Sequence, residues 1–132
     1  MELELLEFVQ DGILGSYYIY LIKEGEAEIG RIVFRLGTLG DHWYDGHVGY
    51  TIKPEYRGQN KSLEACRLLK PLIEELGYDQ VVLTCDPGNE PSKKIIAKLG
   101  GEHVETAPIP REQKKYFDRD EKIKEIYLWR LQ

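Results

Sequence analysis

The sequence predicts an α+β fold in which a twisted, mostly antiparallel sheet packs against a few helices. Short β-rich runs separated by turn residues occupy both ends of the chain, and two middle segments have apolar residues at helical spacing. The tetrapeptide KEGE at 23–26 separates two of the β-rich runs and is typical of a hairpin. We therefore expect a three-layer α/β arrangement, with a mixed sheet of six to seven strands and helices on both faces.

The first half of the chain is predicted to consist of strands. Its amino-terminal segment is ambiguous between an edge strand and a short helix, and we favour the strand because the segment is short. A polar and aromatic loop is expected at 37–46, and Pro54 ends the strand that follows because proline cannot continue a sheet ladder. The expected strands are residues 1–9, 17–22, 28–36 and 47–52.

The second half begins with an amphipathic helix that Gly77 ends. An apolar, β-branched run at 81–84 predicts a buried strand, and the turn residues after it lead into a short helix at 91–99. Strands at 102–105 and 122–131 complete the sheet, with a charged loop or lid at 108–121. The apolar positions of the first helix are Leu63, Cys66, Leu69, Leu72, Ile73 and Leu76.

Composition limits the function classes. A chain of 132 residues suffices for one domain over 1–132 with a single core, and its net charge of −5 without a basic tract argues against nucleic acid and favours cationic amines as partners. Cys66 and Cys85 lack metal-ligand spacing, so we expect reduced thiols, no metal and no disulfide. No apolar run could span a bilayer and the amino terminus is acidic, which predicts a cytoplasmic protein without membrane partners.

The segment at 50–62, YTIKPEYRGQNKS, joins a strand to a helix through a turn rich in backbone donors. The first N–H groups of a helix have no partner within the helix, and the helix dipole places partial positive charge where they point. Anions therefore bind at such junctions. The segment predicts a phosphate-binding turn.

This turn resembles the Q/R-x-x-G-x-G/A turn of the GNAT acyltransferases. Asn60 replaces the second conserved glycine of that pattern, and Ser62 replaces the final Gly or Ala. Asn tolerates the left-handed backbone that glycine usually supplies. A second GNAT pattern, N-x-x-S/A leading into a helix that closes on L-G, is matched downstream in the right order. The matching residues are Arg57, Gly58, Gln59, Asn60, Lys61 and Ser62 in the first motif, and Asn89, Ser92, Leu99 and Gly100 in the second.

The resemblance implies a GNAT-like domain that uses acetyl-CoA as co-substrate. Pantetheine would pair with the backbone of Gly49, Tyr50, Thr51 and Ile52, and the N–H of Tyr50 would polarise the thioester carbonyl. The pyrophosphate would be held by the amides of residues 58–62, that is Gly58, Gln59, Asn60, Lys61 and Ser62, with Arg57 and Lys61 as adjacent cations. Asn89, with Ser92 in the same motif, would contact the pantetheine arm.

The proton-transfer residues are less defined. Many family members carry a Tyr four residues after the S/A position to protonate the departing thiolate, and here that residue is Ile96. Tyr116 or Tyr127 could replace it, or the thiol of CoA could leave without help. His47 is the leading candidate for the general base because imidazole titrates near neutral pH. Weaker candidates for the base are Asp45, Asp41 and His42.

Family members usually have two helices between their first and second strands, which wall the acceptor site. Residues 10–16 are too few for two helices. We therefore expect an acceptor side that is open, closed by residues 108–121, or completed by a second subunit in a homodimer.

The expected function is N-acetyl transfer from acetyl-CoA to a primary amine of a small molecule or peptide. The alternative is a noncatalytic GNAT-like module that binds acyl-CoA or a protein partner. A third reading is an unrelated α/β protein that binds another phosphorylated ligand.

Overall fold

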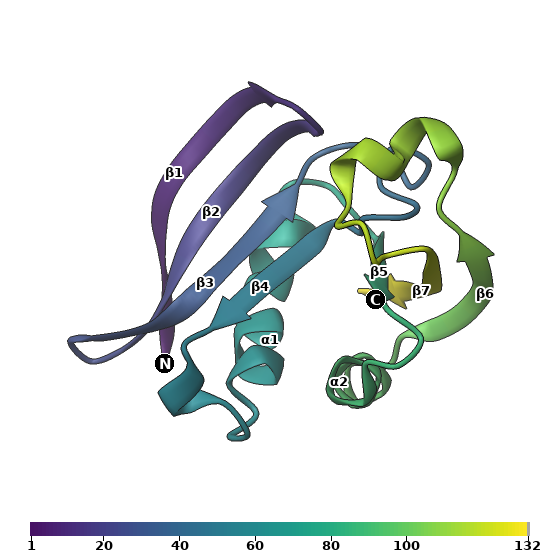
Figure 1. Cartoon of the computed structure of the whole chain (residues 1–132). Helices are drawn as coiled ribbons and strands as arrows, with labels where there is room; N and C mark the ends of the chain where they lie inside the picture. The colour runs from purple at the N-terminus through teal and green to yellow at the C-terminus, as the bar shows by residue number, and fades with distance from the viewer. Residues whose placement is uncertain (132) are drawn as a thin grey trace.

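The computed structural model describes residues 1–131 and divides seven strands between two antiparallel sheets. Figure 1 shows the first sheet on the left of the molecule and the second on the right. The α+β class and the number of strands are confirmed. The first sheet has the order β1 (Glu2–Gly12), β2 (Gly15–Glu24), β3 (Ala27–Arg35), β4 (Val48–Ile52), and the second has the order β5 (Gln80–Cys85), β7 (Ile123–Arg130), β6 (Glu102–Pro108).

The amino-terminal segment is an edge strand, as predicted, and it is longer than the sequence indicated. Strands β1 and β2 continue to Gly12 and Gly15, which face each other across a tight turn at Ile13 and Leu14. The expected absence of helices between these strands is confirmed. The hairpin between β2 and β3 is also confirmed, and Gly25 adopts a φ of 59° in its turn.

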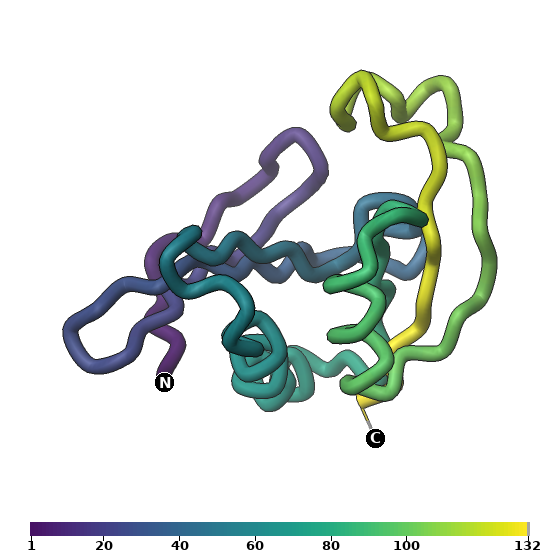
Figure 2. Tube along the Cα trace, turned by 60° about the horizontal axis from the view of Figure 1, so that its bottom comes forward, coloured from purple at the N-terminus to yellow at the C-terminus, as the bar shows by residue number. Residues whose placement is uncertain are grey.

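The two α-helices are α1 (Lys61–Glu75) and α2 (Glu90–Leu99), and they share one core. Helix α1 contacts β1, β3 and β4, helix α2 contacts β5 and β7, and the helices contact each other. Figure 2 shows both helices on the same side of the strands. The core that they cover includes Ile32, Phe34, Cys66, Leu69, Ile73, Val81, Leu83, Ile96 and Trp129.

We expected helices on both faces, but the two α-helices pack on the same core. A loop covers the other face of the second sheet instead. Side chains alternate between faces along a strand, so Val82 and Ile126 point away from the shared core. Leu39, Trp43 and Tyr44 of the loop at 37–46 pack against them.

The segment at 108–121 is not only a loop, because it contains the 3₁₀ helix η2 (Arg111–Tyr116). Lys124 of β7 anchors it. The buried Lys124 Nζ donates to Asp86 Oδ1 at 2.8 Å and to Glu121, and it lies 5.4 Å from the centre of the Phe117 ring. These contacts fix η2 above the end of the second sheet, as Figure 1 shows.

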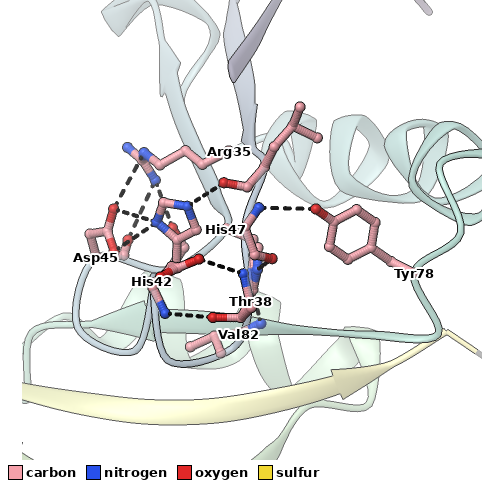
Figure 3. A network of polar contacts seen from close by, with 11 residues as sticks. Arg35, Thr38, His42, Asp45, His47, Tyr78 and Val82 are labelled. Carbon is pink, nitrogen blue, oxygen red and sulfur yellow. Dashed lines mark hydrogen bonds and ion pairs between the residues drawn. The ribbon is translucent and has the colours of Figure 1, made fainter. Parts of the chain in front are cut away.

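One buried histidine joins the two sheets (Figure 3). The backbone N–H of His47 donates to Val82 O at 2.9 Å, and the N–H of Val82 donates to Nδ1 of the His47 ring at 2.9 Å. Because Nδ1 accepts, the ring proton lies on Nε2, which donates to Gly37 O at 3.0 Å. His47 is 0% exposed. Burial lowers the pKa of its ring, and the bond to Gly37 offsets this only in part.

His42 lies beside His47, and its pKa is shifted in the opposite direction. Its Nδ1 is 3.0 Å from Asp45 Oδ2 and its Nε2 is 2.8 Å from Leu36 O, so both ring nitrogens face acceptors. Burial alone would lower the pKa of His42, but the hydrogen bonds to Asp45 and Leu36 outweigh it and the pKa is raised. Arg35 donates to Gly46 O at 3.0 Å on the far side of Asp45. Figure 3 shows this network closing the loop at 37–46.

We expect His47→Leu to destabilise the fold strongly. The substitution leaves the Val82 N–H and the Gly37 carbonyl without their partner, and a buried group orphaned in this way costs about 1–3 kcal/mol. His47→Asn should cost less because the side-chain amide oxygen can accept from Val82 N. Urea denaturation measures both, with His103→Asn, an exposed histidine, as the control. Equal stability of the two His47 variants would contradict the proposed joint.

The two buried histidines should give opposite pH dependences. The folded pKa of His47 is lowered, so its contribution to stability is present above the unfolded pKa of about 6.5 and is lost as pH falls through the folded pKa. The folded pKa of His42 is raised, so its contribution is full below that value and is lost as pH rises through the folded pKa.

In urea denaturation across pH, the stability difference between wild type and His47→Asn should therefore grow as pH rises. The difference between wild type and His42→Gln should shrink over the same range. Parallel curves for the two variants would contradict these assignments.

Candidate functional site

A groove of about 640 Å³ lies between the carboxyl end of β4, the start of α1 and one face of α2. It adjoins a smaller cavity that residues of both β4 and β5 line. The residues that line the groove are Tyr50, Thr51, Ile52, Tyr56, Arg57, Gly58, Asn60, Lys61, Ser62, Pro91, Ser92, Lys94, Ile95 and Lys98.

The turn before α1 points backbone donors into this groove. After the 3₁₀ helix η1 (Pro54–Tyr56), Gly58 and Asn60 adopt φ values of 81° and 58°, and Asn60 is the N-cap of α1 in the left-handed region. Asn60 thus takes the backbone conformation expected of a glycine substitute. No side-chain hydrogen bond caps α1. The first amides of the helix, from Lys61 onward, are therefore available to an anion.

Four cations line the same groove, and one of them, Lys61, is paired with a carboxylate. Lys94 and Lys98 are four residues apart on α2, which places both on the face that lines the groove. Arg57 Nε donates to Ile52 O at 2.9 Å, which holds the turn against the end of β4. The ammonium of Lys61 bonds to the carboxylate of Glu24, which raises the pKa of Lys61. Because the described lining includes no carboxylate, the groove favours a ligand with several negative charges.

The inner end of the groove opens onto unpaired backbone of β4. Lys53 N donates to Ile29 O at 2.9 Å, and this bond shows which alternate residues of β4 are hydrogen-bonded to β3. Every second residue of an antiparallel strand bonds to its partner strand, so Thr51 bonds to β3. The N–H and C=O groups of Tyr50 and Ile52 point away from β3, and of these the C=O of Ile52 accepts from Arg57 Nε. Since β4 and β5 belong to different sheets, no ladder takes up these groups.

The side chain of Tyr50 crosses from β4 to α2. Its hydroxyl lies 3.4 Å from Ser92 Oγ, and burial raises its pKa. Tyr50 and Ser92 line both the groove and a smaller cavity beneath it of about 30 Å³. Val48, Leu83 and Ile96 form apolar walls of the smaller cavity. The groove therefore narrows from a cationic mouth to an apolar inner end.

Most residues predicted to bind the cofactor come together in this groove, namely Tyr50, Thr51, Ile52, Arg57, Gly58, Asn60, Lys61, Ser62 and Ser92. Gly49 and Gln59 are not among its lining residues. The side chain of Asn89 accepts from Ser92 N at 3.2 Å and caps α2, so its observed role is structural.

The predicted catalytic side chains do not meet at the groove. Both ring nitrogens of the fully buried His47 are hydrogen-bonded, and this geometry argues against a role as general base. Tyr116 lies on η2 and is 40% exposed, on a different cavity. At the inner end, the ionisable side chains among the described lining residues are the hydroxyl of Tyr50 and the thiol of Cys66, and burial raises the pKa of that thiol to about 12.

Several lining residues were not predicted. Lys98 could have been found from its spacing to Lys94 on the expected helix. Tyr56, Pro91 and Ile95 carry no signal of their own and join the groove because α2 packs beside α1.

No cluster of three or more side chains suited to bind a metal occurs in residues 1–131. Neither α-helix of that part of the chain is long and apolar enough to cross a membrane.

Comparison with known proteins agrees with this geometry. A family model described as an acetyltransferase (GNAT) domain matches residues 4–102. An uncharacterized N-acetyltransferase of Bacillus subtilis (strain 168), YnaD, is 28% identical over 81 residues, which are 61% of this chain and 46% of that protein. The chain thus spans about half the length of this curated relative.

Solved structures show the same fold at low identity. The apo ribosomal L7/L12 alpha-N-protein acetyltransferase RimL superposes with a TM-score of 0.67 at 17% identity, covering 87% of this chain and 70% of that one. Microcin C7 self-immunity acetyltransferase MccE, solved with acetyl-CoA and AMP, gives 0.65 at 16% identity, covering 85% and 59%. A GNAT-family acetyltransferase from Bacillus anthracis gives 0.64 at 22%, covering 87% and 66%.

The family model covers most of the chain, and the residues that it matches include the groove and the turn before α1. The chain belongs to the GNAT acetyltransferase family.

Proposed function

We propose that this chain is an N-acetyltransferase that moves the acetyl group of acetyl-CoA to a primary amine. The observation that carries the proposal is the unpaired backbone of Tyr50, which faces the space between the sheets at the inner end of a cationic groove. A diphosphate suits the amides at the start of α1, and Arg57, Lys61, Lys94 and Lys98 add positive charge around them. The narrow apolar end suits a thioester arm.

In the proposed reaction the amine nitrogen attacks the thioester carbonyl carbon. A C–N bond forms, the C–S bond breaks, and the sulfur leaves with the electron pair while the amine gives up a proton. The N–H of Tyr50 would donate to the carbonyl oxygen as negative charge develops there. A preorganised donor in a site with little water stabilises such charge far more than it would in bulk water.

Proton transfer in this proposal does not involve His47. The hydroxyl of Tyr50 lines the inner end of the groove and would give the sulfur its proton, and its raised pKa keeps it protonated at neutral pH. No side chain at the inner end of the described groove is a carboxylate or a free imidazole. In this proposal the amine therefore releases its proton to water.

That lack of a side-chain base also favours a second candidate function, a noncatalytic module that binds acyl-CoA. Both functions need the groove, and only the enzyme turns over. Binding therefore tests the groove, and thiol release tests the chemistry.

Acetyl-CoA should stabilise the protein against thermal unfolding. Ligand at about a hundred times its dissociation constant adds about 2.7 kcal/mol to the free energy of unfolding. The measurement is the melting temperature with and without acetyl-CoA, and adenosine serves as a control without the diphosphate. An unchanged melting temperature at millimolar acetyl-CoA would rule out both candidates. Thiol release with a panel of amines then separates the enzyme from the module.

Gly58→Val should abolish the stabilisation by acetyl-CoA. The φ of 81° at Gly58 disfavours any side chain, and a β-branched one most, so the turn must change shape and move its amides. Gly77→Val is the matched control, because Gly77 also has a positive φ, 94°, and open space around it, but lies outside the groove. Arg57→Ala should weaken binding only modestly. Retained stabilisation in Gly58→Val would place the anion elsewhere.

A further inference from the structure

A second cavity of about 480 Å³ lies on the face of the first sheet that the helices do not cover. Tyr17 pairs with Arg35 across β2 and β3, and both alternate with residues whose side chains face the core. The turn at 13–14 forms one rim and η2 forms the other. We call this the far pocket, and it is lined by Tyr17, Val33, Arg35, Lys115, Tyr116 and the turn at 13–14.

The far pocket and the groove lie on opposite sides of β4. Val33 pairs with Gly49, and a Cβ built on Gly49 would come within 3.0 Å of Arg35 Nη2 and 3.2 Å of Val33 Cγ2. The guanidinium of Arg35 therefore lies directly over the backbone of Gly49. The next residue, Tyr50, presents its N–H to the space between the sheets. A reactant in the far pocket thus lies beside β4, and it would reach the groove through the gap between β4 and β5, which no ladder of the described chain closes.

The charged side chains that line the far pocket are cations, and one of them, Arg35, is paired with Asp45 behind it. Arg35 Nη1 donates to Gly46 O at 3.0 Å, and the carboxylate of Asp45 lies 3.7 Å from Nε and is also bound by His42. No hydrogen bond is found for Nη2 within the described chain. Burial lowers the pKa of Arg35, yet a guanidinium stays protonated in proteins. Lys115 is the second cation, and no acidic side chain is among the described lining residues.

We propose that the far pocket binds the acceptor and selects an amine that carries a carboxylate next to an apolar or aromatic side chain, the chemistry of an amino acid. The inference rests on the proposed transferase function. The carboxylate would pair with Arg35 and Lys115, the apolar side chain would lie against Val33 and Tyr17, and the amine would face Gly49. The net charge of −5 had favoured cationic acceptors, but no Asp or Glu side chain is among the described residues that line this pocket.

Matched pairs of compounds test the carboxylate. N-acetyl-L-phenylalanine and N-acetyl-2-phenylethylamine differ only in that group, and their binding is measured by saturation-transfer NMR with and without CoA. The acid should bind at least about tenfold more tightly, since an ionised hydrogen bond is lost without it. In thiol-release assays L-phenylalanine should exceed 2-phenylethylamine in kcat/KM by a similar factor. Equal or tighter binding of the neutral compound would overturn the proposal.

Variants test which cations act. Arg35→Gln and Lys115→Gln should each weaken binding of the acid about tenfold, and the exposed Lys115 variant covers the case in which Arg35→Gln unfolds. Arg31→Gln is the control, because Arg31 is exposed on the same face of β3 and does not line the pocket. Unchanged binding in the Lys115 variant, or an equal loss in the Arg31 variant, would overturn the proposal.

A phosphate could bind the same cations, so phosphoethanolamine is compared with ethanolamine and with the amino acids. A preference for phosphoethanolamine over every carboxylate would overturn the assignment. The thermal shift with acetyl-CoA distinguishes failure of the transferase proposal from failure of the acceptor proposal. The Arg35 and Lys115 variants should retain this shift. A lost shift in wild type would remove the transferase function, whereas a retained shift without acid binding would remove only the acceptor class.

Discussion

The fold depends on one junction, the pair of hydrogen bonds between His47 and Val82. They connect the first sheet to the second at the amino end of β4, and within the described chain no ladder joins β4 to β5 beyond that point. A continuous ladder would occupy the backbone groups of Tyr50 and Ile52. Without the junction, the shared helices and the loop at 37–46 would still connect the two sheets. The two sheets are thus joined at the amino end of β4 and left apart at its carboxyl end. The first condition helps to hold the core together, and the second leaves backbone groups unpaired at the groove.

Local patterns in the sequence determine much of this architecture. The helical spacing from Leu63 to Leu76, the glycines after both helices and the run at 81–84 each match an observed element, because these signals act within a few residues. Residues 111–116 gave no such signal. The segment that contains this 3₁₀ helix is held to β7 by contacts of Lys124 with Glu121 and the Phe117 ring, and these contacts belong to no local helix pattern. The division of the sheet also has no local signature, because it depends on which strand edges stay unpaired.

The site was predictable where backbone geometry determines it. Gly58 and Asn60 have the left-handed conformations that the turn pattern requires, and the groove lies beside them. Side-chain roles were harder to infer. The sequence made His47 the leading candidate for the general base, but the loop at 37–46 folds over it and its partner Val82 is 35 residues away. Arg35 gave no signal, because a strand pattern does not say which face lacks a covering helix.

The position of β4 between the groove and the far pocket has a consequence for how such a protein could work. Two reactants that approach from opposite faces do not obstruct each other, and either could arrive or depart while the other stays in place. Because no ladder of the described chain joins β4 to β5, the reacting atoms could meet directly in the gap beside β4. Under the proposed function, a group can then pass between the two compartments without first being attached to the protein.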